Sequence, residues 1–300
     1  MIKIDSNLAA ALERTLILDR MDGRTARDPL YAFALDELLC RRTGQGGPSI
    51  CHIWRHPSAF IMGLRDSRLP HAEEGLRWLE SQGFQAAVRH SGGAAVPLDA
   101  GVVNISLILP MNAAGTEDYK QDFERMYQLL REAIGRRTAP AVDKGEIDGA
   151  YCPGDYDLSI DGFKFCGIAQ RRQTNAFIVQ AFVVAEGSGA RRAGLVRDFY
   201  AIAAEGADSS QYPLVREDST RSLEELAGLG PRSAEAFAAA VKETIRSYQL
   251  DDGLLADMKA FALPTADEIE AMADSLRSRY AIAAREDDFD GDGGSDASQN

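Results

Sequence analysis

Apolar residues recur with helical spacing in several segments of the chain, and the first long segment covers residues 30–42. Its apolar face carries Phe33, Leu35, Leu38 and Leu39. Asp28-Pro29 comes just before it and supplies an N-cap residue followed by proline at the first helical position. The same spacing predicts further helices over residues 72–82, 116–135, 190–204, 231–248 and 265–284, and a capping-box pattern begins at Ser222.

Short runs of β-branched and aromatic residues lie between these helices and are typical of strands. They predict an edge strand over residues 15–18 and further strands over residues 50–54, 60–64, 85–89, 102–109 and 176–185. This order of elements, with short connections, favours an α+β fold. We expect a mixed, largely antiparallel central sheet flanked by helices, with accessory helices near the C-terminus. The expected organisation is a main domain over residues 1–215, a helical extension over residues 216–285 and a disordered acidic tail over residues 286–300.

A turn-rich stretch over residues 149–172 reads GAYCPGDYDLSIDGFKFCGIAQRR and predicts a loop followed by a β-hairpin. Cys152 lies beside Pro153-Gly154, a pair that interrupts any regular element, so its sulfur is expected on a loop. Asp161-Gly162 supplies the two-residue hairpin turn, and Lys164 lies at the start of the return strand. We therefore expect Lys164 and Cys152 to lie close together.

Composition and charge narrow the classes of function. Of the 300 residues, 45% are hydrophobic and 26% are charged, and the formal net charge is -13. Residues 286–300 hold six acidic and no basic residues, which leaves 40 acids against 33 bases in the rest of the chain. Nucleic-acid binding needs a basic face, and a membrane span needs roughly 20 consecutive apolar residues. Since the chain offers neither, we expect no nucleic-acid partner and no membrane segment.

The four cysteines, Cys40, Cys51, Cys152 and Cys166, include no CxxC pair. Their spacing indicates neither a disulfide framework nor a zinc site, so we expect a reduced, cytoplasmic protein without a bound metal. The N-terminal residues lack the uninterrupted apolar run of an export signal. No phosphate-binding loop or dinucleotide fingerprint is present either, and we expect no cofactor.

Cys152 itself has two interpretations. A free cysteine is most often a buried, inert apolar residue. Its place in a turn, with a lysine across the hairpin, favours a nucleophile instead, because a nearby ammonium lowers a thiol pKa from about 8.5 and the thiolate is the attacking species. Cys166 follows Lys164 in an apolar strand, and we expect it to pack in the core.

Two other segments also have two interpretations each. The glycines of His90-Ser91-Gly92-Gly93 could form a tight turn between strands, or they could let the backbone approach a ligand closely. Gln170-Arg171-Arg172 is either a solvated strand end or a positive rim that meets a carboxylate-rich partner.

Two long motifs, RHSGGAAVPLDAGVVNISL and YCPGDYDLSIDGFKFCGIAQRR, resemble the biotin/lipoate protein ligase superfamily over residues 30–206. The second motif is most similar to the amidotransferases of lipoate assembly, which take octanoyl groups from the glycine cleavage H protein. The resemblance implies the catalytic-domain fold of the superfamily. It also implies that Cys152 holds an octanoyl thioester and that Lys164 favours the thiolate and steadies the acyl carbonyl. The substrate-binding residues that it implies are Arg89, Ser91, Gly92, Gly93, Gly167, Ile168 and Ala169.

By this resemblance the chain is an acyltransferase of lipoate biosynthesis. It would move an octanoyl group from the lipoyl-domain lysine of the H protein to lipoyl-domain lysines of 2-oxoacid dehydrogenase subunits, through a thioester on Cys152. Ala94 stands where ATP-using ligases of the superfamily have another glycine, and Pro97-Leu98 replaces their Tyr-His pair. Three alternatives stay open: an octanoyltransferase that takes the chain from acyl carrier protein, an ATP-dependent lipoate-protein ligase, and a non-catalytic lipoyl-domain binding module.

Overall fold

The computed structural model describes residues 6–22, 28–111, 119–250 and 253–280. Its strands are β1 (Leu16–Arg20), β2 (Ile50–Trp54), β3 (Ser58–Met62), β4 (Gln85–Val88), β5 (Val96–Asp99), β6 (Val102–Pro110), β7 (Asp143–Lys144), β8 (Leu158–Ile160), β9 (Phe163–Arg172) and β10 (Ala176–Val184). Its α-helices are α1 (Ser6–Leu12), α2 (Tyr31–Gly44), α3 (Ala72–Ser81), α4 (Tyr119–Gly135), α5 (Gly189–Ala203), α6 (Leu223–Ala227), α7 (Ser233–Tyr248), α8 (Leu254–Ala260) and α9 (Ala266–Arg279).

Seven strands form the central sheet, in the order β1-β2-β6-β10-β9-β8-β7. β1 runs parallel to β2, and the other neighbouring pairs are antiparallel. β1 lies at one edge, as predicted. The long strands β6 and β10 lie in the middle with nearly every side chain buried, which explains their continuous apolar sequence. The predicted α+β class with a largely antiparallel central sheet is therefore confirmed.

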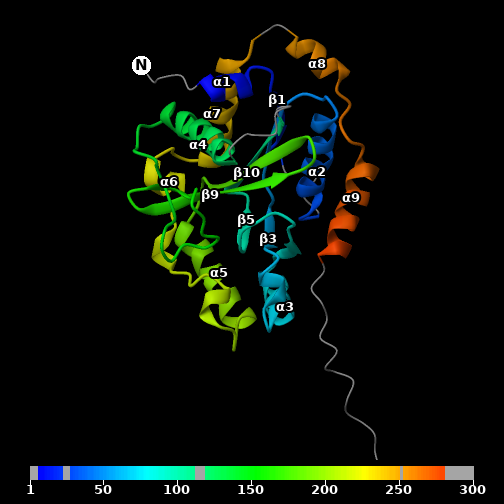
Figure 1. Ribbon diagram of the computed structural model, residues 1–300. Coiled ribbons are helices and arrows are strands. Elements are labelled where there is room, and N and C mark those ends of the chain that lie inside the picture. Colours follow the sequence, from blue (N-terminus) through cyan, green and yellow to red (C-terminus); the bar gives the residue numbers. More distant parts are fainter. Residues whose placement is uncertain (1–5, 23–27, 112–118, 251–252, 281–300) are drawn as a thin grey trace, which may run out of the picture.

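Helices cover both faces of this sheet (Figure 1). On one face, apolar side chains of α1, α4 and α7 join those of β6, β9 and β10 in a core cluster. On the other face α2 packs against β6 and β10, and α9 packs against α2. The two faces thus give two apolar layers, and the site described below lies on the α2 side.

The sequence pattern does not distinguish a second, three-stranded sheet with the order β4-β3-β5. β3 is parallel to β4 and antiparallel to β5, and α3 and α5 pack beside this sheet on the α2 side. The strand predicted over residues 60–64 lies over Ser58–Met62 instead. The reason is a turn that begins directly after Met62, in which the Gly63 N–H donates to the Asp66 carboxylate at 2.7 Å.

β8 and β9 form the predicted hairpin. Asp161 and Gly162 have φ angles of +51° and +78°, the left-handed conformation that both central residues of a type I′ turn require. After the turn, β9 pairs with β10 as far as Arg172. The hairpin therefore joins the loop of Cys152 to the central sheet.

The segment after residue 215 is helical, as predicted. The capping box at α6 is confirmed, since the Ser222 hydroxyl accepts a hydrogen bond from the Glu225 N–H and the Glu225 carboxylate accepts one from the Ser222 N–H. Phe237, Val241 and Ile245 of α7 are buried in the core beneath the central sheet. The domain boundary at residues 215/216 stays a prediction, and the predicted acidic tail over residues 286–300 lies outside the described residues.

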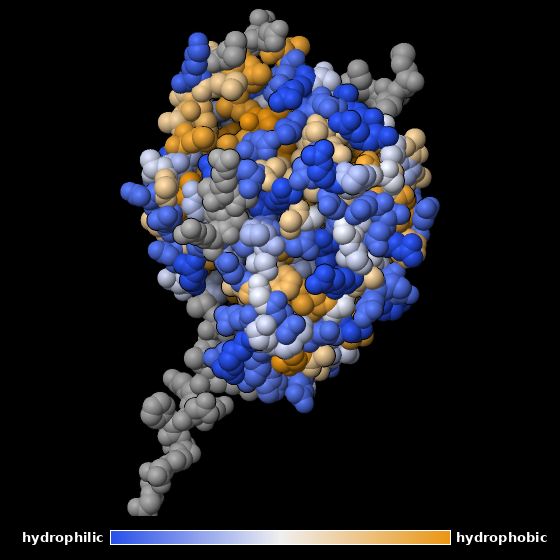
Figure 2. Space-filling model, turned by 180° about the vertical axis from the view of Figure 1, so that it is seen from behind, coloured by the Kyte–Doolittle hydropathy of each residue, from blue (hydrophilic) through white to orange (hydrophobic). Residues whose placement is uncertain are grey.

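The surface seen in Figure 2 is largely polar. Its largest apolar area lies at the end of the molecule where Figure 1 places α8, and the segment between α7 and α9 exposes Leu250, Met258 and Leu263. Among the helices of the described residues, we find none with the length and apolar character needed to cross a bilayer.

Candidate active site

A cavity of about 460 Å³ opens on the α2 side of the central sheet. Apolar side chains form much of its wall, among them Phe33, Ile61, Val96, Leu98 and Phe182. The predicted site residues that line it come from three separate parts of the chain and are Arg89, Ser91, Gly92, Gly93, Cys152, Gly167, Ile168 and Ala169. An apolar cavity of this size with a few polar groups is typical of a small-ligand site.

The register of the sheet builds one wall of the cavity. Trp54, Asn104, Phe182 and Gly167 are paired neighbours on β2, β6, β10 and β9, and so lie in one row across the sheet. A Cβ on Gly167 would lie 2.5 Å from the Phe182 ring, so glycine is needed to leave that ring in place. Phe182 stacks on Tyr151 with ring centroids 5.8 Å apart. The sheet therefore fixes the backbone next to the predicted nucleophile.

Cys152 lies on a loop, as predicted, and its φ of +47° is rare for a non-glycine residue. The turn is closed by two hydrogen bonds, from the Asp157 N–H to the Gly154 carbonyl at 3.0 Å and from the Gly154 N–H to the Asp157 carboxylate at 3.2 Å. The Cys152 Sγ lies 3.3 Å from Nη2 of Arg89. A Cβ on Gly93 would lie 2.5 Å from that nitrogen and 2.9 Å from the sulfur, so glycine permits their contact.

The Lys164 ammonium lies beneath the Cys152 loop, and the residue is 1% exposed. Its Nζ donates to the carbonyl oxygens of Tyr151 at 2.8 Å and Cys152 at 2.6 Å, and to the Asp157 carboxylate at 2.7 Å. Each of its three protons thus has an acceptor. Burial raises the pKa of Asp157 to about 6, although the attraction of Lys164 opposes the shift. Lys164 therefore contacts the Cys152 backbone, while the side-chain contact to the sulfur comes from Arg89.

The other three cysteines are unsuited to chemistry. Cys40, Cys51 and Cys166 are fully buried, and burial raises the pKa of Cys40 to about 12 and also raises the thiol pKa of the other two. Cys166 pairs with Val183 and packs in the core on the opposite face of the sheet from the cavity, as its apolar surroundings predict. Cys152, which is partly exposed, is the thiol placed for reaction.

A buried polar network that the sequence analysis missed lies at the α2 side of the cavity. Asp36 of α2 is fully buried, and its carboxylate accepts hydrogen bonds from the Ser106 hydroxyl at 2.5 Å and the Gln180 amide at 3.0 Å. The His52 Nδ1 lies 2.8 Å from the same carboxylate. Ser106 and Gln180 also line the cavity, so its wall carries fixed polar groups.

Two unpartnered donors belong to the same wall. Trp54 Nε1 and Asn104 Nδ2 are buried and have no hydrogen-bond partner among the described residues, and both residues line the cavity. The sequence carried a signal for part of this set, because Asn104 and Ser106 alternate in one predicted strand and so must share a face. Trp54 and Gln180 are brought in by strand pairing, which no local pattern shows.

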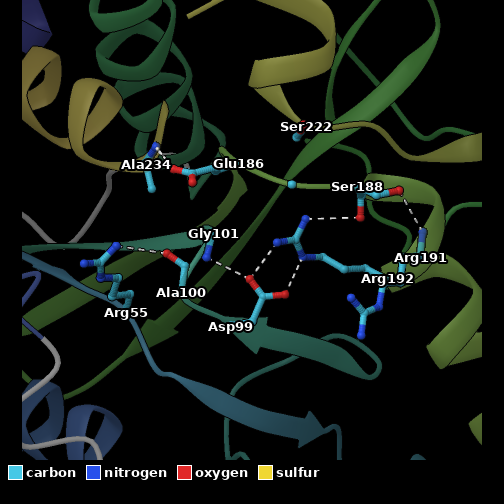
Figure 3. Close-up of polar contacts among 12 residues, drawn as sticks. Arg55, Asp99, Ala100, Gly101, Glu186, Ser188, Arg191, Arg192, Ser222 and Ala234 are labelled. Carbon is cyan, nitrogen blue, oxygen red and sulfur yellow. Dashed lines mark hydrogen bonds and ion pairs between the residues drawn. The ribbon is translucent and has the colours of Figure 1, made fainter. Parts of the chain in front are cut away.

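The Asp99-Ala100-Gly101 turn of the first motif lies beside the site and supports the fold (Figure 3). The Asp99 carboxylate accepts a hydrogen bond from the Gly101 N–H at 2.8 Å, and it pairs with the Arg192 guanidinium of α5 at 2.6 and 2.9 Å. A Cβ on Gly101 would collide with the Glu186 carbonyl oxygen. This turn therefore ties the β5–β6 connection to α5.

Arg171 and Arg172 do not form the free positive rim that was one interpretation of the sequence. Arg171 pairs with Glu37 of α2, and Arg172 pairs with Asp122 of α4 at 2.5 Å. The His90 Nε2 lies 2.6 Å from Glu37. Burial alone would raise the pKa of Glu37, but the hydrogen bonds from His90 and Arg171 outweigh burial and lower the pKa to about 2. Both arginines thus hold β9 to its flanking helices.

A second hollow of about 610 Å³ adjoins the first. Ser91, Gly92, Gly93 and Pro153 line both of them, so this segment forms a shared wall. The second hollow also borders the exposed Arg65. A group that enters it would therefore lie against residues 91–93 and against Pro153, which directly follows Cys152.

Comparison with known proteins identifies relatives over most of the chain. Residues 28–246 match the family described as lipoyl protein ligase A/B catalytic domain. The chain is 45% identical over 196 residues to an octanoyl-[GcvH]:protein N-octanoyltransferase of Exiguobacterium sibiricum. The matched region covers 65% of this chain and 70% of that protein. A protein of the same name from Geobacillus kaustophilus is 40% identical over 234 residues, covering 77% and 82%. A lipoyl-[GcvH]:protein N-lipoyltransferase of Listeria monocytogenes is 36% identical over 211 residues, covering 70% and 75%.

Solved structures with a similar fold are more distant in sequence. A lipoate-protein ligase A bound with ATP superposes with a TM-score of 0.61 at 18% identity, covering 90% of this chain and 96% of that chain. Ta0514, a putative lipoate protein ligase from T. acidophilum, superposes with a TM-score of 0.58 at 20% identity, covering 89% and 94%. These likenesses confirm the ligase-type fold that the sequence motifs imply.

Proposed function

The chain belongs to the lipoyl protein ligase A/B catalytic domain family, and from this premise we propose that it is an octanoyltransferase of lipoate biosynthesis. It takes the octanoyl group from the lipoyl-domain lysine of the glycine cleavage H protein and passes it to lipoyl-domain lysines of 2-oxoacid dehydrogenase subunits. The observation that carries this proposal is the position of Cys152, whose sulfur lies 3.3 Å from a guanidinium nitrogen at the wall of an apolar cavity. The names of the relatives support the acyl group and the H protein as a substrate.

In the first half-reaction, the Cys152 thiolate attacks the carbonyl carbon of the octanoyl amide. A carbon–sulfur bond forms and gives a tetrahedral oxyanion. The oxyanion collapses as the carbon–nitrogen bond breaks, and the donor lysine leaves as an amine after taking up a proton. This half is the harder one, because an amide is converted into a more reactive thioester, and it requires preorganised donors for the oxyanion.

In the second half-reaction, the amine of the acceptor lysine attacks the thioester carbonyl. A carbon–nitrogen bond forms, the carbon–sulfur bond breaks, the amine loses a proton and Cys152 returns to the thiolate. The octanoyl chain lies meanwhile in the apolar cavity beside Gly167, Ile168 and Ala169, which line it. Because one site serves both lysines in turn, ping-pong kinetics are expected.

Ser91, Gly92 and Gly93 line both hollows. We therefore assign to these residues the edge of the opening through which each lysine reaches Cys152. The Lys164 ammonium fixes the loop on which the nucleophile lies. The chemistry needs a reduced thiol, which agrees with the cytoplasmic setting that the cysteine pattern predicts.

ATP-dependent ligation is the less favoured alternative. Ala94 and Pro97-Leu98 replace residues typical of ATP-using members of the superfamily, and the relatives named above are transferases. The carrier-protein alternative differs only in its donor, which is a thioester, so the same nucleophile would serve it. The alternatives therefore have to be separated by donor.

The test is to incubate the protein and an unmodified lipoyl domain separately with octanoyl H protein, with octanoyl acyl carrier protein, and with octanoate plus ATP. We expect the lipoyl domain to gain an octanoyl group from the H protein, without AMP formation. Transfer from the carrier protein alone, or transfer that produces AMP, would contradict the proposal. Binding of the lipoyl domain without transfer from any donor would identify a binding module instead.

A further inference from the structure

We propose that Arg89 is a catalytic residue of this enzyme, whose guanidinium stabilises first the Cys152 thiolate and then the oxyanion formed on the attacked acyl carbonyl. The oxyanion part rests on the proposed function, whereas the thiolate part concerns the free protein. Lys164, the cation that the sequence pairs with Cys152, is then a positioning residue that holds the loop.

The contact geometry places Arg89 on the reacting atom. The residue is 7% exposed, and its backbone N–H is fixed by a hydrogen bond to the Met62 carbonyl at 2.9 Å. Its Nη2 donates to the Ala94 carbonyl at 2.7 Å and lies 3.3 Å from the Cys152 sulfur. Its Nε is buried and has no hydrogen-bond partner among the described residues. Arg89 also lines the cavity, so we assign the contact with the acyl oxygen to its guanidinium group.

The charge of Arg89 has no carboxylate partner in the described part of the chain. Burial raises the pKa of Asp66 and the charge of Arg89 opposes this shift, but the two Asp66 oxygens accept hydrogen bonds from the Gly63 N–H at 2.7 Å and the Tyr200 hydroxyl at 2.8 Å and not from Arg89. A buried cation is costly without an opposite charge. The anion that the geometry offers to Arg89 is the Cys152 thiolate, so the pair becomes neutral when the thiol ionises.

The charge of Lys164 is balanced differently. Asp157 accepts a hydrogen bond from its Nζ at 2.7 Å, and its other two protons are directed to backbone carbonyls. Two tyrosines next to the site, Tyr151 and Tyr200, have pKa values raised by burial and stay neutral near pH 7. Asp155 borders the cavity but is exposed to solvent. Arg89 is therefore the charged group with a donor on the sulfur.

The test is the pH dependence of Cys152 alkylation by iodoacetamide in the full chain without substrate. The other three cysteines are fully buried, so alkylation of the folded protein reports Cys152. In Arg89→Gln, we expect the pH midpoint of the alkylation rate to rise by about one unit or more, because a charge-assisted hydrogen bond to the thiolate is lost. Arg68→Gln removes the same charge from an exposed position and is expected to leave the midpoint unchanged.

A second comparison separates Arg89 from Lys164. The double variant Lys164→Met/Asp157→Asn removes the buried ion pair without a change of net charge, and we expect a smaller shift of the midpoint than in Arg89→Gln. Thermal unfolding establishes that each variant is folded. If Arg89→Gln does not fold, Arg89→Lys takes its place. This variant keeps the charge on a shorter side chain without the planar guanidinium, and we expect slower acylation and a smaller upward shift.

An unchanged midpoint in folded Arg89→Gln, or an unchanged midpoint and acylation rate in Arg89→Lys, would overturn the proposal. A larger shift in the double variant than in Arg89→Gln would return the role to Lys164. A raised midpoint in Arg89→Gln, with no octanoyl transfer by the wild-type protein, would refute the proposed function while leaving the thiolate contact in place. Failure of the two proposals is thus distinguishable.

Discussion

Replacing Lys164 by methionine tests how the loop of the nucleophile is held. The substitution removes three hydrogen bonds of a buried ammonium, one to the Asp157 carboxylate and two to backbone carbonyls. At about 1.5–3 kcal/mol for the first and about 1 kcal/mol for each of the others, the free energy of unfolding should fall by roughly 3–5 kcal/mol. Removal of one partner from a buried ion pair has a cost of the same size, about 3–5 kcal/mol, because the other charge stays behind. Urea denaturation followed by circular dichroism measures the change.

Lys242 provides a matched control, because its ion pair with Asp19 is partly exposed and such pairs contribute about 0–1 kcal/mol. Lys242→Met should therefore lower the free energy of unfolding by less than about 1 kcal/mol. Adding Asp157→Asn to Lys164→Met should recover part of the loss, since a neutral amide needs no cation and can still accept the hydrogen bond from the Gly154 N–H. If Lys164→Met costs no more than Lys242→Met, or if Asp157→Asn recovers nothing in the double variant, Lys164 does not hold the loop through a buried ion pair.

Three further results are expected. Because folding raises the pKa of Asp157 from 3.8 to about 6, the folded protein binds the extra proton, and the free energy of unfolding should fall by about 2 kcal/mol as the pH rises from about 4 to about 6. Asp157→Asn should abolish this fall with pH in urea denaturation measured at a series of pH values. An unaltered pH dependence would show that Asp157 is not its source. Gly167→Ala places a Cβ 2.5 Å from the Phe182 ring, so we expect a loss of about 1–3 kcal/mol in denaturation and slower octanoyl transfer, neither of which would occur if the ring had room to move. Ser222→Ala removes the cap of α6 and should cost about 0.5–2 kcal/mol in the same denaturation assay with octanoyl transfer unchanged, whereas a loss of transfer would show that α6 serves the site.

Features set by neighbouring residues could be predicted from the sequence. Asp161-Gly162 specifies its turn through backbone conformation, and Ser222 specifies a capping box through spacing. Asp36 and Glu37 show where local patterns fail. They lie on the polar side of the predicted helix, but the sheet and the arginine at the end of β9 bury them both. Their burial follows from tertiary contacts with distant strands, which no periodicity within α2 reveals.

The same distinction applies to the site. The turn around Cys152 and the hairpin that brings Lys164 near it are local, so the sequence predicts both. The contact between Arg89 and the Cys152 sulfur is not local, because it joins the end of β4 to a loop far along the chain. It also requires a glycine at position 93, where a side chain would collide with both groups. The Trp54 and Gln180 side chains at the cavity wall likewise depend on strand pairing. Distances of this kind required the structure.

The most direct test of the central proposal is intact-mass measurement of the protein after incubation with octanoyl H protein in the absence of an acceptor. We predict one octanoyl adduct, located on Cys152 by peptide mapping, absent in Cys152→Ser and discharged when an unmodified lipoyl domain is added. Octanoyl transfer that proceeds in Cys152→Ser, or an adduct on another residue, would contradict catalysis through a Cys152 thioester.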